Sequence, residues 1–377
     1  MEIFTLALPY LLFSVCCSVL MVNISKSWYS SYKNRINLIR LFLLESSLIC
    51  IIVVFCSFRT NVILPDGRII GGNDTLNYKN LFHSAYPMSY LSYLEYTRQE
   101  PLYCLLAWSV ARITHSFQIM LVIIYISMSL CVIKYCKLIK QNVWYFWGNL
   151  CVMLLFLESF NTLRTIWALF LTIFVVDFLF RNKYKHAWCI TFIASLIHIT
   201  GIINALIIII YYIIKHSSRR IVIKNVTLIS LCYFILISFL IIIVPQITYG
   251  RYYRYAIEGG SFSSALFISY IYVMFCNITT RGFSTDIKNR NLLIIITIFM
   301  PFIILQLKYA MVYRIMLMVM PYIFLMILQI REFSKRSLKI PINCITILFF
   351  TIRILSFIEG RIYSLGGQYV FMGIRSE

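Results

Sequence analysis

Long apolar runs, separated by short polar segments, recur along the chain. They cover residues 3–22, 38–58, 117–135, 143–158, 162–180, 187–214, 226–244, 264–280, 291–307, 312–330 and 341–357. A helix of about 20 apolar residues crosses the roughly 30 Å hydrocarbon core of a bilayer. A helix also satisfies its own backbone hydrogen bonds in lipid, whereas strands of a membrane barrel would alternate polar and apolar residues, as these runs do not. The pattern predicts an all-α, polytopic integral membrane protein.

The basic residues predict how the chain crosses the membrane. Lys and Arg gather in short connections such as 23–37, 134–140 and 181–186, and such an excess is typical of cytoplasmic loops. In contrast, the charges of residues 59–100 balance, as in translocated segments. We therefore expect a single polytopic domain over 1–377 with about 12 transmembrane helices, outer loops at 59–100 and 245–263, and both termini outside.

Two apolar segments do not fit the simple alternation of spans. Residues 101–114 are too short to cross, and a crossing there would put a basic loop outside, so we expect one short non-spanning helix in the outer leaflet. Residues 187–214 have basic residues at both ends. We expect this run to rise, break at Thr200–Gly201 and return, which places His198 at the outer turn.

Composition agrees with the membrane class and excludes several functions. Hydrophobic residues make up 61% and charged residues 12% of the chain, and the mean hydropathy is +0.85. The net charge of +21 resides in loops rather than in a basic stripe with interleaved aromatics, so we expect no nucleic-acid partner. The 12 cysteines lie in or beside apolar runs without zinc-ligand spacing. No P-loop, nucleophile-elbow or HEXXH motif occurs, and we expect neither a metal nor a cofactor.

Polar residues that could form a site converge on the outer side of this topology. They are Arg68, Asp74, Tyr78, Asn161, Arg164, His198, Arg251, Arg254, Lys308 and Arg314. A cluster rich in Arg suits an anionic substrate, because a guanidinium donates two parallel hydrogen bonds to phosphate oxygens. Asn161 could cap the helix that carries Arg164 and turn its positive end toward the same anion. Each residue also has a simpler explanation, since Arg near a helix end commonly anchors at the membrane surface and His in a span commonly links helices.

Five segments in this part of the chain resemble elements of one protein family. They read RIIGGNDTLNY (68–78), NTLRTIWALF (161–170), SLIHITGII (195–203), RYYRYAIEGG (251–260) and YRIMLMVMPY (313–322). The first three resemble the R-x-x-G-x-D-x-x-x-Y, N-x-x-R-x-x-x-A and F-H-x-S elements of EpsG-like, Wzy-type bacterial polysaccharide polymerases. Three positions depart from that pattern: Thr165 stands where Gln is common, Ile197 replaces Phe, and Thr200 replaces Ser.

The resemblance implies an enzyme, a glycosyltransferase that polymerises oligosaccharide repeat units into O-antigen, capsule or exopolysaccharide. Its substrate would be undecaprenyl-diphosphate-linked oligosaccharide, joined without metal at the outer face of the bacterial plasma (inner) membrane, toward the periplasm or exterior. His198 would be the catalytic base with Asp74 as its rival. The residues expected to bind diphosphate or glycan are Arg68, Tyr78, Asn161, Arg164, Arg251, Arg254 and Arg314. Implied partners are membrane lipid and the flippase and chain-length regulator of the same pathway.

Three other functions remain open at this point. A ligase or another lipid-linked glycan transferase would share the architecture and move the glycan to a different acceptor. A lipid-linked oligosaccharide transporter would need a polar path through the bilayer and related halves, whereas these polar residues lie on one side. A purely structural membrane subunit would leave the outer Arg cluster unexplained.

Overall fold

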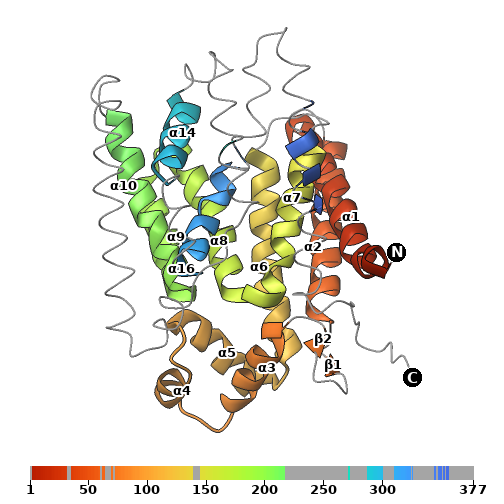
Figure 1. Cartoon of the computed structure of the whole chain (residues 1–377), viewed down its shortest axis with the longest axis vertical. Coiled ribbons are helices and arrows are strands. Elements are labelled where there is room, and N and C mark those ends of the chain that lie inside the picture. The colour runs from red at the N-terminus through yellow and green to blue at the C-terminus, as the bar shows by residue number, and fades with distance from the viewer. Residues whose placement is uncertain are drawn as a thin grey trace. The chain divides into compact units, whose positions relative to one another are not determined.

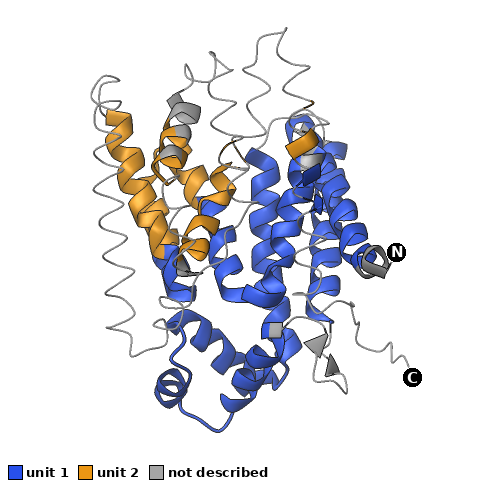
Figure 2. Ribbon diagram, viewed as in Figure 1, with its two compact units in different colours: residues 1–174, 192–201, 350–377 blue, residues 175–191, 202–349 orange. Residues whose placement is uncertain are grey.

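The computed structural model describes residues 2–31, 35–59, 62–63, 69–70, 73–138, 145–216, 287–299 and 310–323, with a few isolated positions between 271 and 355. These parts are almost wholly helical (Figure 1). Two compact units divide the chain: unit 1 comprises residues 1–174, 192–201 and 350–377, and unit 2 comprises 175–191 and 202–349 (Figure 2).

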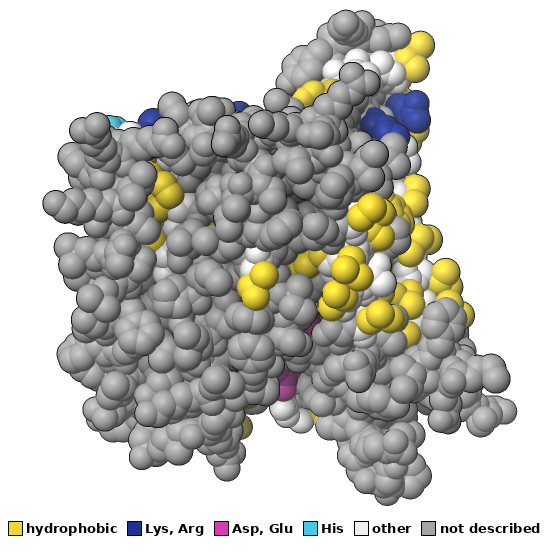
Figure 3. Space-filling model, turned by 45° about the horizontal axis from the view of Figure 1, so that its top comes forward, with side chains coloured by type: hydrophobic (Ala, Val, Ile, Leu, Met, Phe, Trp, Pro, Cys, Tyr) yellow, Lys and Arg dark blue, Asp and Glu magenta, His cyan; other side chains and the backbone are white. Residues whose placement is uncertain are grey.

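Unit 1 is built on three long apolar helices. Helices α1 (Glu2–Ser31) and α2 (Arg35–Ser57) pack on each other, and both pack on α6 (Phe117–Leu138). Much of their outward surface is apolar, with Phe42 and Leu43 among the exposed side chains. Figure 3 shows hydrophobic side chains along this flank and Lys and Arg side chains near its upper end. Apolar side chains in these positions suit lipid rather than water.

A polar segment connects α2 to α6 at one end of these helices (Figure 1). It contains the antiparallel pair β1 (Val62–Ile63) and β2 (Ile69–Ile70), and the helices α3 (Asn73–Ser84), α4 (Tyr90–Thr97) and α5 (Pro101–Thr114). Helix α5 has the bounds predicted for the short helix, and its 14 residues are fewer than a membrane span needs.

Side-chain contacts hold these short helices together. The Ser89 hydroxyl accepts a hydrogen bond of 3.2 Å from the Ser92 N–H and so caps α4. Trp108 Nε1 and Arg112 Nη2 both donate to the Met88 carbonyl, at 3.0 and 2.7 Å. Helix α5 is thereby fixed against the connection between α3 and α4.

The chain then enters α7 (Tyr145–Leu157) and α8 (Ser159–Phe180), which carries Asn161 and Arg164. Thr162 interrupts the start of α8 with non-helical backbone angles, φ −128° and ψ 53°. The regular helix that carries Arg164 therefore resumes after Thr162. Asn161, which the sequence suggested as the cap of this helix, directly precedes the non-helical position, and the Thr162 hydroxyl donates to the Glu158 carbonyl at 3.1 Å.

The predicted break in the run 187–214 is confirmed. Helix α9 (Tyr184–Ile197) ends before His198, the short 3₁₀ turn η1 (Ile199–Ile202) follows, and α10 (Ile203–His216) continues the chain. In unit 2, Lys215 Nζ donates to Asn182 Oδ1 at 2.5 Å. The end of α10 thus returns to the start of α9, as expected for a segment that rises and turns back.

Unit 2 also contains α14 (Ile287–Phe299), which packs on α10, and α16 (Ala310–Leu317). The hydroxyl of Tyr322 donates to Asn204 Oδ1 at 3.5 Å, and both side chains are fully buried.

Within the described residues, five helices are long and apolar enough to cross a membrane: Ala7–Ser30, Ile36–Ser57, Phe117–Leu138, Ser159–Phe180 and Ile199–His216. Two further apolar helices are shorter, Gly148–Leu157 and Val312–Ile323. The predicted span 226–244, the outer loop 245–263 and, except for Ile271, the predicted span 264–280 lie outside the described residues, which include only parts of the last three predicted spans. The total of about 12 spans therefore stays a prediction.

Candidate functional site

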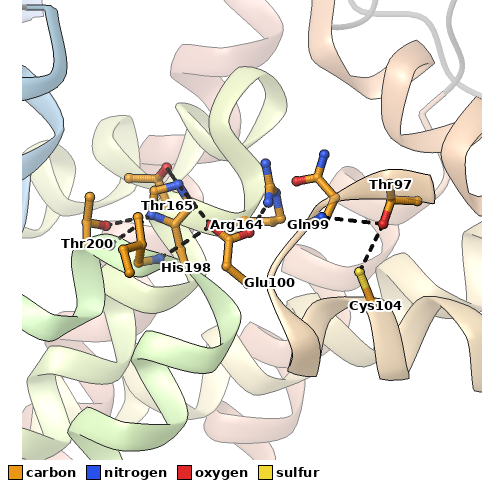
Figure 4. Close-up of polar contacts among 9 residues, drawn as sticks. Thr97, Gln99, Glu100, Cys104, Arg164, Thr165, His198 and Thr200 are labelled. Atoms are coloured by element: carbon orange, nitrogen blue, oxygen red, sulfur yellow. Dashed lines mark hydrogen bonds and ion pairs between the residues drawn. The ribbon is translucent and has the colours of Figure 1, made fainter. Parts of the chain in front are cut away.

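The candidate site centres on a buried ion pair between two distant parts of unit 1. Arg164, in the first regular turn of α8, is only 9% exposed, and its Nη1 pairs with the carboxylate of Glu100 (Figure 4). Glu100 lies directly before Pro101, at the N-cap position of α5. Since arginine does not lose its proton in proteins, a buried guanidinium needs an anion near it. Glu100 supplies that anion here.

Two tyrosines line the guanidinium of Arg164. Its Cζ lies 5.8 Å from the ring centre of Tyr78 and 5.4 Å from that of Tyr103, and these two rings meet edge to face at 5.9 Å. Burial, and then the neighbouring Tyr78, raise the pKa of Tyr103 well above its ordinary value, although Arg164 opposes this shift. Tyr103 therefore stays a neutral phenol, and the rings attract the cation through their faces.

The guanidinium of Arg164 keeps hydrogen-bonding capacity beyond this pair. Its Nε is buried and has no hydrogen-bond acceptor among the described residues. A planar guanidinium can serve two oxyanion groups on different edges. Arg164 can therefore hold Glu100 and a second anion at the same time.

His198, at the turn between α9 and η1, is 2% exposed and lies beside this pair. Its Nδ1 accepts a hydrogen bond of 3.3 Å from the Thr200 N–H and lies 2.7 Å from the Thr200 hydroxyl. Its Nε2 lies 3.2 Å from Thr165 Oγ1 and 4.0 Å from Glu100 Oε1. A backbone N–H can only donate, so Nδ1 is the unprotonated nitrogen of the neutral ring and Nε2 carries the hydrogen.

This assignment gives the two threonines a role. Thr165 and Thr200 are positions at which the chain departs from the sequence pattern described above, and both contact His198. Each supplies a hydroxyl at a ring nitrogen, so together they fix the orientation of the imidazole, while the Thr200 N–H sets its tautomer.

Glu100 is the site residue that sequence reasoning missed. Besides Arg164 it meets the turn after α9, because its Oε1 accepts from the Ile199 N–H at 3.4 Å. One carboxylate therefore joins α5, α8 and the His198 turn. In the sequence Glu100 is only one of the balanced charges of the outer segment, and the available signal was an acidic residue directly before the proline that begins an apolar helix.

A second buried cation, Arg59, was also missed. It follows α2, is 3% exposed, and its Cζ lies 3.6 Å from the ring centre of Phe160. Its Nη2 donates to Thr75 Oγ1 at 2.8 Å, and the Thr75 hydroxyl in turn donates to the Phe160 carbonyl at 3.0 Å. This chain of contacts fixes the start of α3, and hence Tyr78, to the start of α8.

We expect Thr75→Val to lower the free energy of unfolding by about 1–3 kcal/mol, because it removes the acceptor of a buried Arg59 N–H and the donor to the Phe160 carbonyl. Thr75→Ser keeps the hydroxyl and serves as the matched control. Thermal unfolding in detergent measures both variants, and a melting temperature of Thr75→Val equal to that of the wild type would refute the bridging role of Thr75.

The other predicted residues are distributed as follows. Asp74 lies in the first turn of α3, one helical turn before Tyr78 and so on the same face, and is partly exposed. Asn161 is partly exposed at the start of α8. Arg314 is half-buried in α16 of unit 2. Arg68, Arg251, Arg254 and Lys308 lie outside the described residues.

The described geometry suits the binding of an oxyanion beside a group that can exchange a proton. Among the described residues no group of three or more His, Cys, Asp or Glu is placed to hold a metal ion. The family model described as EpsG family matches residues 42–363, most of the chain, including Glu100, Arg164 and His198. No curated protein and no solved structure matches the chain.

Proposed function

The chain belongs to the EpsG family, the family of Wzy-type polysaccharide polymerase-like proteins, and from this membership we propose that it joins undecaprenyl-diphosphate-linked oligosaccharide repeats. It is a polymerase-like membrane protein of polysaccharide biosynthesis. The proposed reaction is a glycosyl transfer at the outer face of the bacterial plasma membrane, in which the growing glycan passes from its lipid diphosphate to the next lipid-linked repeat.

The observation that carries the proposal is the buried Arg164 guanidinium, with one carboxylate, two tyrosine rings and a remaining N–H donor around it. In glycosyl transfer from a diphosphate, negative charge grows on the leaving phosphate oxygens. A fixed cation in a site poor in water stabilises that charge far better than water does. Arg164 meets this requirement at the end of an apolar helix, where a lipid-linked substrate would present its diphosphate.

We propose further that Arg68, Arg251, Arg254 and Arg314 each bind diphosphate or glycan, as the sequence predicts, and that Tyr78, Asn161 and Asp74 do so in unit 1. Membrane lipid and the flippase and chain-length regulator of the same pathway are the proposed partners. The flippase would supply substrate to the outer face.

The proposal is tested by purified protein in liposomes supplied with a purified undecaprenyl-diphosphate-linked repeat. We expect a ladder of products that differ by one repeat unit. A single transfer of the glycan to a different acceptor would favour a ligase. Movement of the lipid-linked repeat across the bilayer, without any lengthening of the glycan, would favour a transporter. Either result would contradict the polymerase assignment.

The proposed orientation makes a separate prediction. A cysteine that replaces the exposed Asn77 in α3 should react with an impermeant thiol reagent in intact cells, whereas one that replaces the exposed Asn182, beside the basic turn, should react only after lysis. Labelling is compared with that of the parent protein, which carries the native cysteines. Reaction of Asn182→Cys in intact cells would contradict an outward-facing site.

A further inference from the structure

We propose that Glu100 accepts the proton from the attacking hydroxyl and that His198, whose Nε2 lies 4.0 Å from the Glu100 carboxylate, holds the turn that positions Glu100. This inference rests on the proposed glycosyl transfer. It assigns the base to a residue outside the sequence motifs, and it gives His198, the base expected from the sequence, a different part in the reaction.

The contacts of His198 carry the first step of the argument. The lone pair on Nδ1 faces the Thr200 N–H at 3.3 Å and the Thr200 hydroxyl at 2.7 Å. The other nitrogen, Nε2, carries the ring hydrogen and faces Thr165 and Glu100. A base must present a lone pair to the hydroxyl whose proton it takes. In this arrangement the lone pair of His198 is turned toward the protein's own backbone, while its N–H donates to Thr165 Oγ1, with the Glu100 carboxylate 4.0 Å from Nε2.

The position of Glu100 carries the second step. Its side chain is 11% exposed, one oxygen pairs with Arg164, and the other lies 3.4 Å from the Ile199 nitrogen and 4.0 Å from His198 Nε2. An ionised carboxylate has about four lone-pair sites for hydrogen bonds, and one can therefore serve an acceptor hydroxyl. If Arg164 binds the diphosphate, the anomeric carbon lies one bond from a phosphate oxygen, so Glu100 is close to the reacting atoms.

The chemical step balances with these groups alone. The acceptor hydroxyl gives its proton to the Glu100 carboxylate, and the hydroxyl oxygen forms the new bond to the anomeric carbon of the donor glycan. The bond from that carbon to the phosphate oxygen breaks, and its electron pair leaves with undecaprenyl diphosphate. Glu100 then returns the proton to water.

The ion pair with Arg164 couples the two halves of this step. As Glu100 takes the proton it loses its charge, and at the same moment negative charge grows on the diphosphate. The negative charge near Arg164 therefore moves from Glu100 to the diphosphate, and the total charge around Arg164 does not change. A buried cation that is never left without a counter-charge avoids the penalty of an isolated buried ion.

The simpler alternative is that Glu100 only neutralises Arg164. Glu100→Gln tests the two roles through separate measurements of turnover and affinity, since its amide oxygen can still accept from Arg164 but the neutral side chain cannot take a proton. We expect its turnover to fall by about 10²–10⁴-fold, with affinity for the lipid-linked repeat unchanged. His198→Gln keeps an N–H donor and should retain turnover within about tenfold. Glu95→Gln, in exposed surface of α4, is the matched control and should behave as wild type.

Chemical rescue measures a change in polymerisation rate that a purely structural role of Glu100 would not produce. Adding formate to Glu100→Ala supplies a small carboxylate at the vacated position, and we expect it to accelerate polymerisation. If Glu100→Gln fails to fold, this variant decides, with chloride as an anion that can neutralise Arg164 but is too weak a base to take the proton: acceleration by formate and not by chloride supports the inference, and equal acceleration by both, or none by formate, overturns it.

The outcomes separate this inference from the proposed function. Wild-type protein that makes no polymer from lipid-linked repeats would refute the proposed function itself. An active wild type together with near-normal turnover in Glu100→Gln would overturn only the role of Glu100. A loss of activity in Glu100→Gln that is explained entirely by weaker substrate binding would likewise reduce Glu100 to a counter-ion.

Discussion

Arg164→Lys is expected to abolish long-chain polysaccharide although it preserves the positive charge. A lysine ammonium is a point charge and cannot present the flat fork that holds Glu100 on one edge and a phosphate on another. Loss of one donor to a developing oxyanion typically slows turnover by about 10²–10³-fold. Chain length is read from glycan gels of a strain that lacks the native protein and expresses the variant, with the variant's level in the membrane measured in parallel.

Arg112→Lys is the matched control for this experiment. Arg112 is an exposed arginine of α5 that lies 5.5 Å from the Trp108 ring centre and donates to the Met88 carbonyl. It has no contact with the Glu100–Arg164 pair among those described, so its replacement should leave chain length unchanged. Wild-type chain length from Arg164→Lys, at a normal level in the membrane, would exclude a bidentate role for Arg164.

The second large effect is expected from Gly201→Ala, which adds one methyl group. A Cβ at this position would lie 2.5 Å from the Ala194 carbonyl carbon and 2.6 Å from the Ser195 nitrogen. Both are backbone atoms and cannot rotate away, so the turn itself must move. Overpacking of this kind costs about 1–3 kcal/mol or more.

The displaced turn also carries His198 and Thr200, and the Gly201 N–H donates to the His198 carbonyl at 2.8 Å. A misplacement of about 1 Å near reacting groups can cost about 10²-fold in rate. We therefore expect Gly201→Ala to lower both the melting temperature in detergent and polymer length. Ile202→Ala, at an exposed position of the same turn, should alter neither, and a Gly201→Ala variant normal in both would show that the turn tolerates a side chain.

The sequence alone predicted the features of the fold that depend on hydropathy and on the positions of charged residues. The short helix 101–114 followed from its length, and the break at Thr200–Gly201 followed from the basic residues at both ends of the run. That Tyr78, Arg164 and His198 share one side was also predictable, since the expected topology puts all three on the outer side of the membrane. The structure brings these three side chains to one cluster in unit 1.

The same reasoning could not find Glu100 or Arg59. The balance of charges in residues 59–100 indicates a translocated loop, but it does not say which of those charges is buried or with what it pairs. Glu100 reaches Arg164 across 64 positions in the sequence, and such a pairing depends on how α5 packs. Similarly, hydropathy gave no sign of the non-helical Thr162 that interrupts the start of α8 directly after Asn161.

The central claim is that Arg164 binds and stabilises the diphosphate that leaves during glycosyl transfer. It is tested most directly by counting undecaprenyl diphosphate released per glycosidic linkage formed, in liposomes that contain wild-type protein or Arg164→Met. We expect the wild type to release one undecaprenyl diphosphate for each linkage that it forms. In Arg164→Met, we expect the rates of linkage formation and of diphosphate release to fall together, by at least about 10²-fold. Linkages formed by Arg164→Met at the wild-type rate, or diphosphate released by the wild type without linkage, would contradict this account.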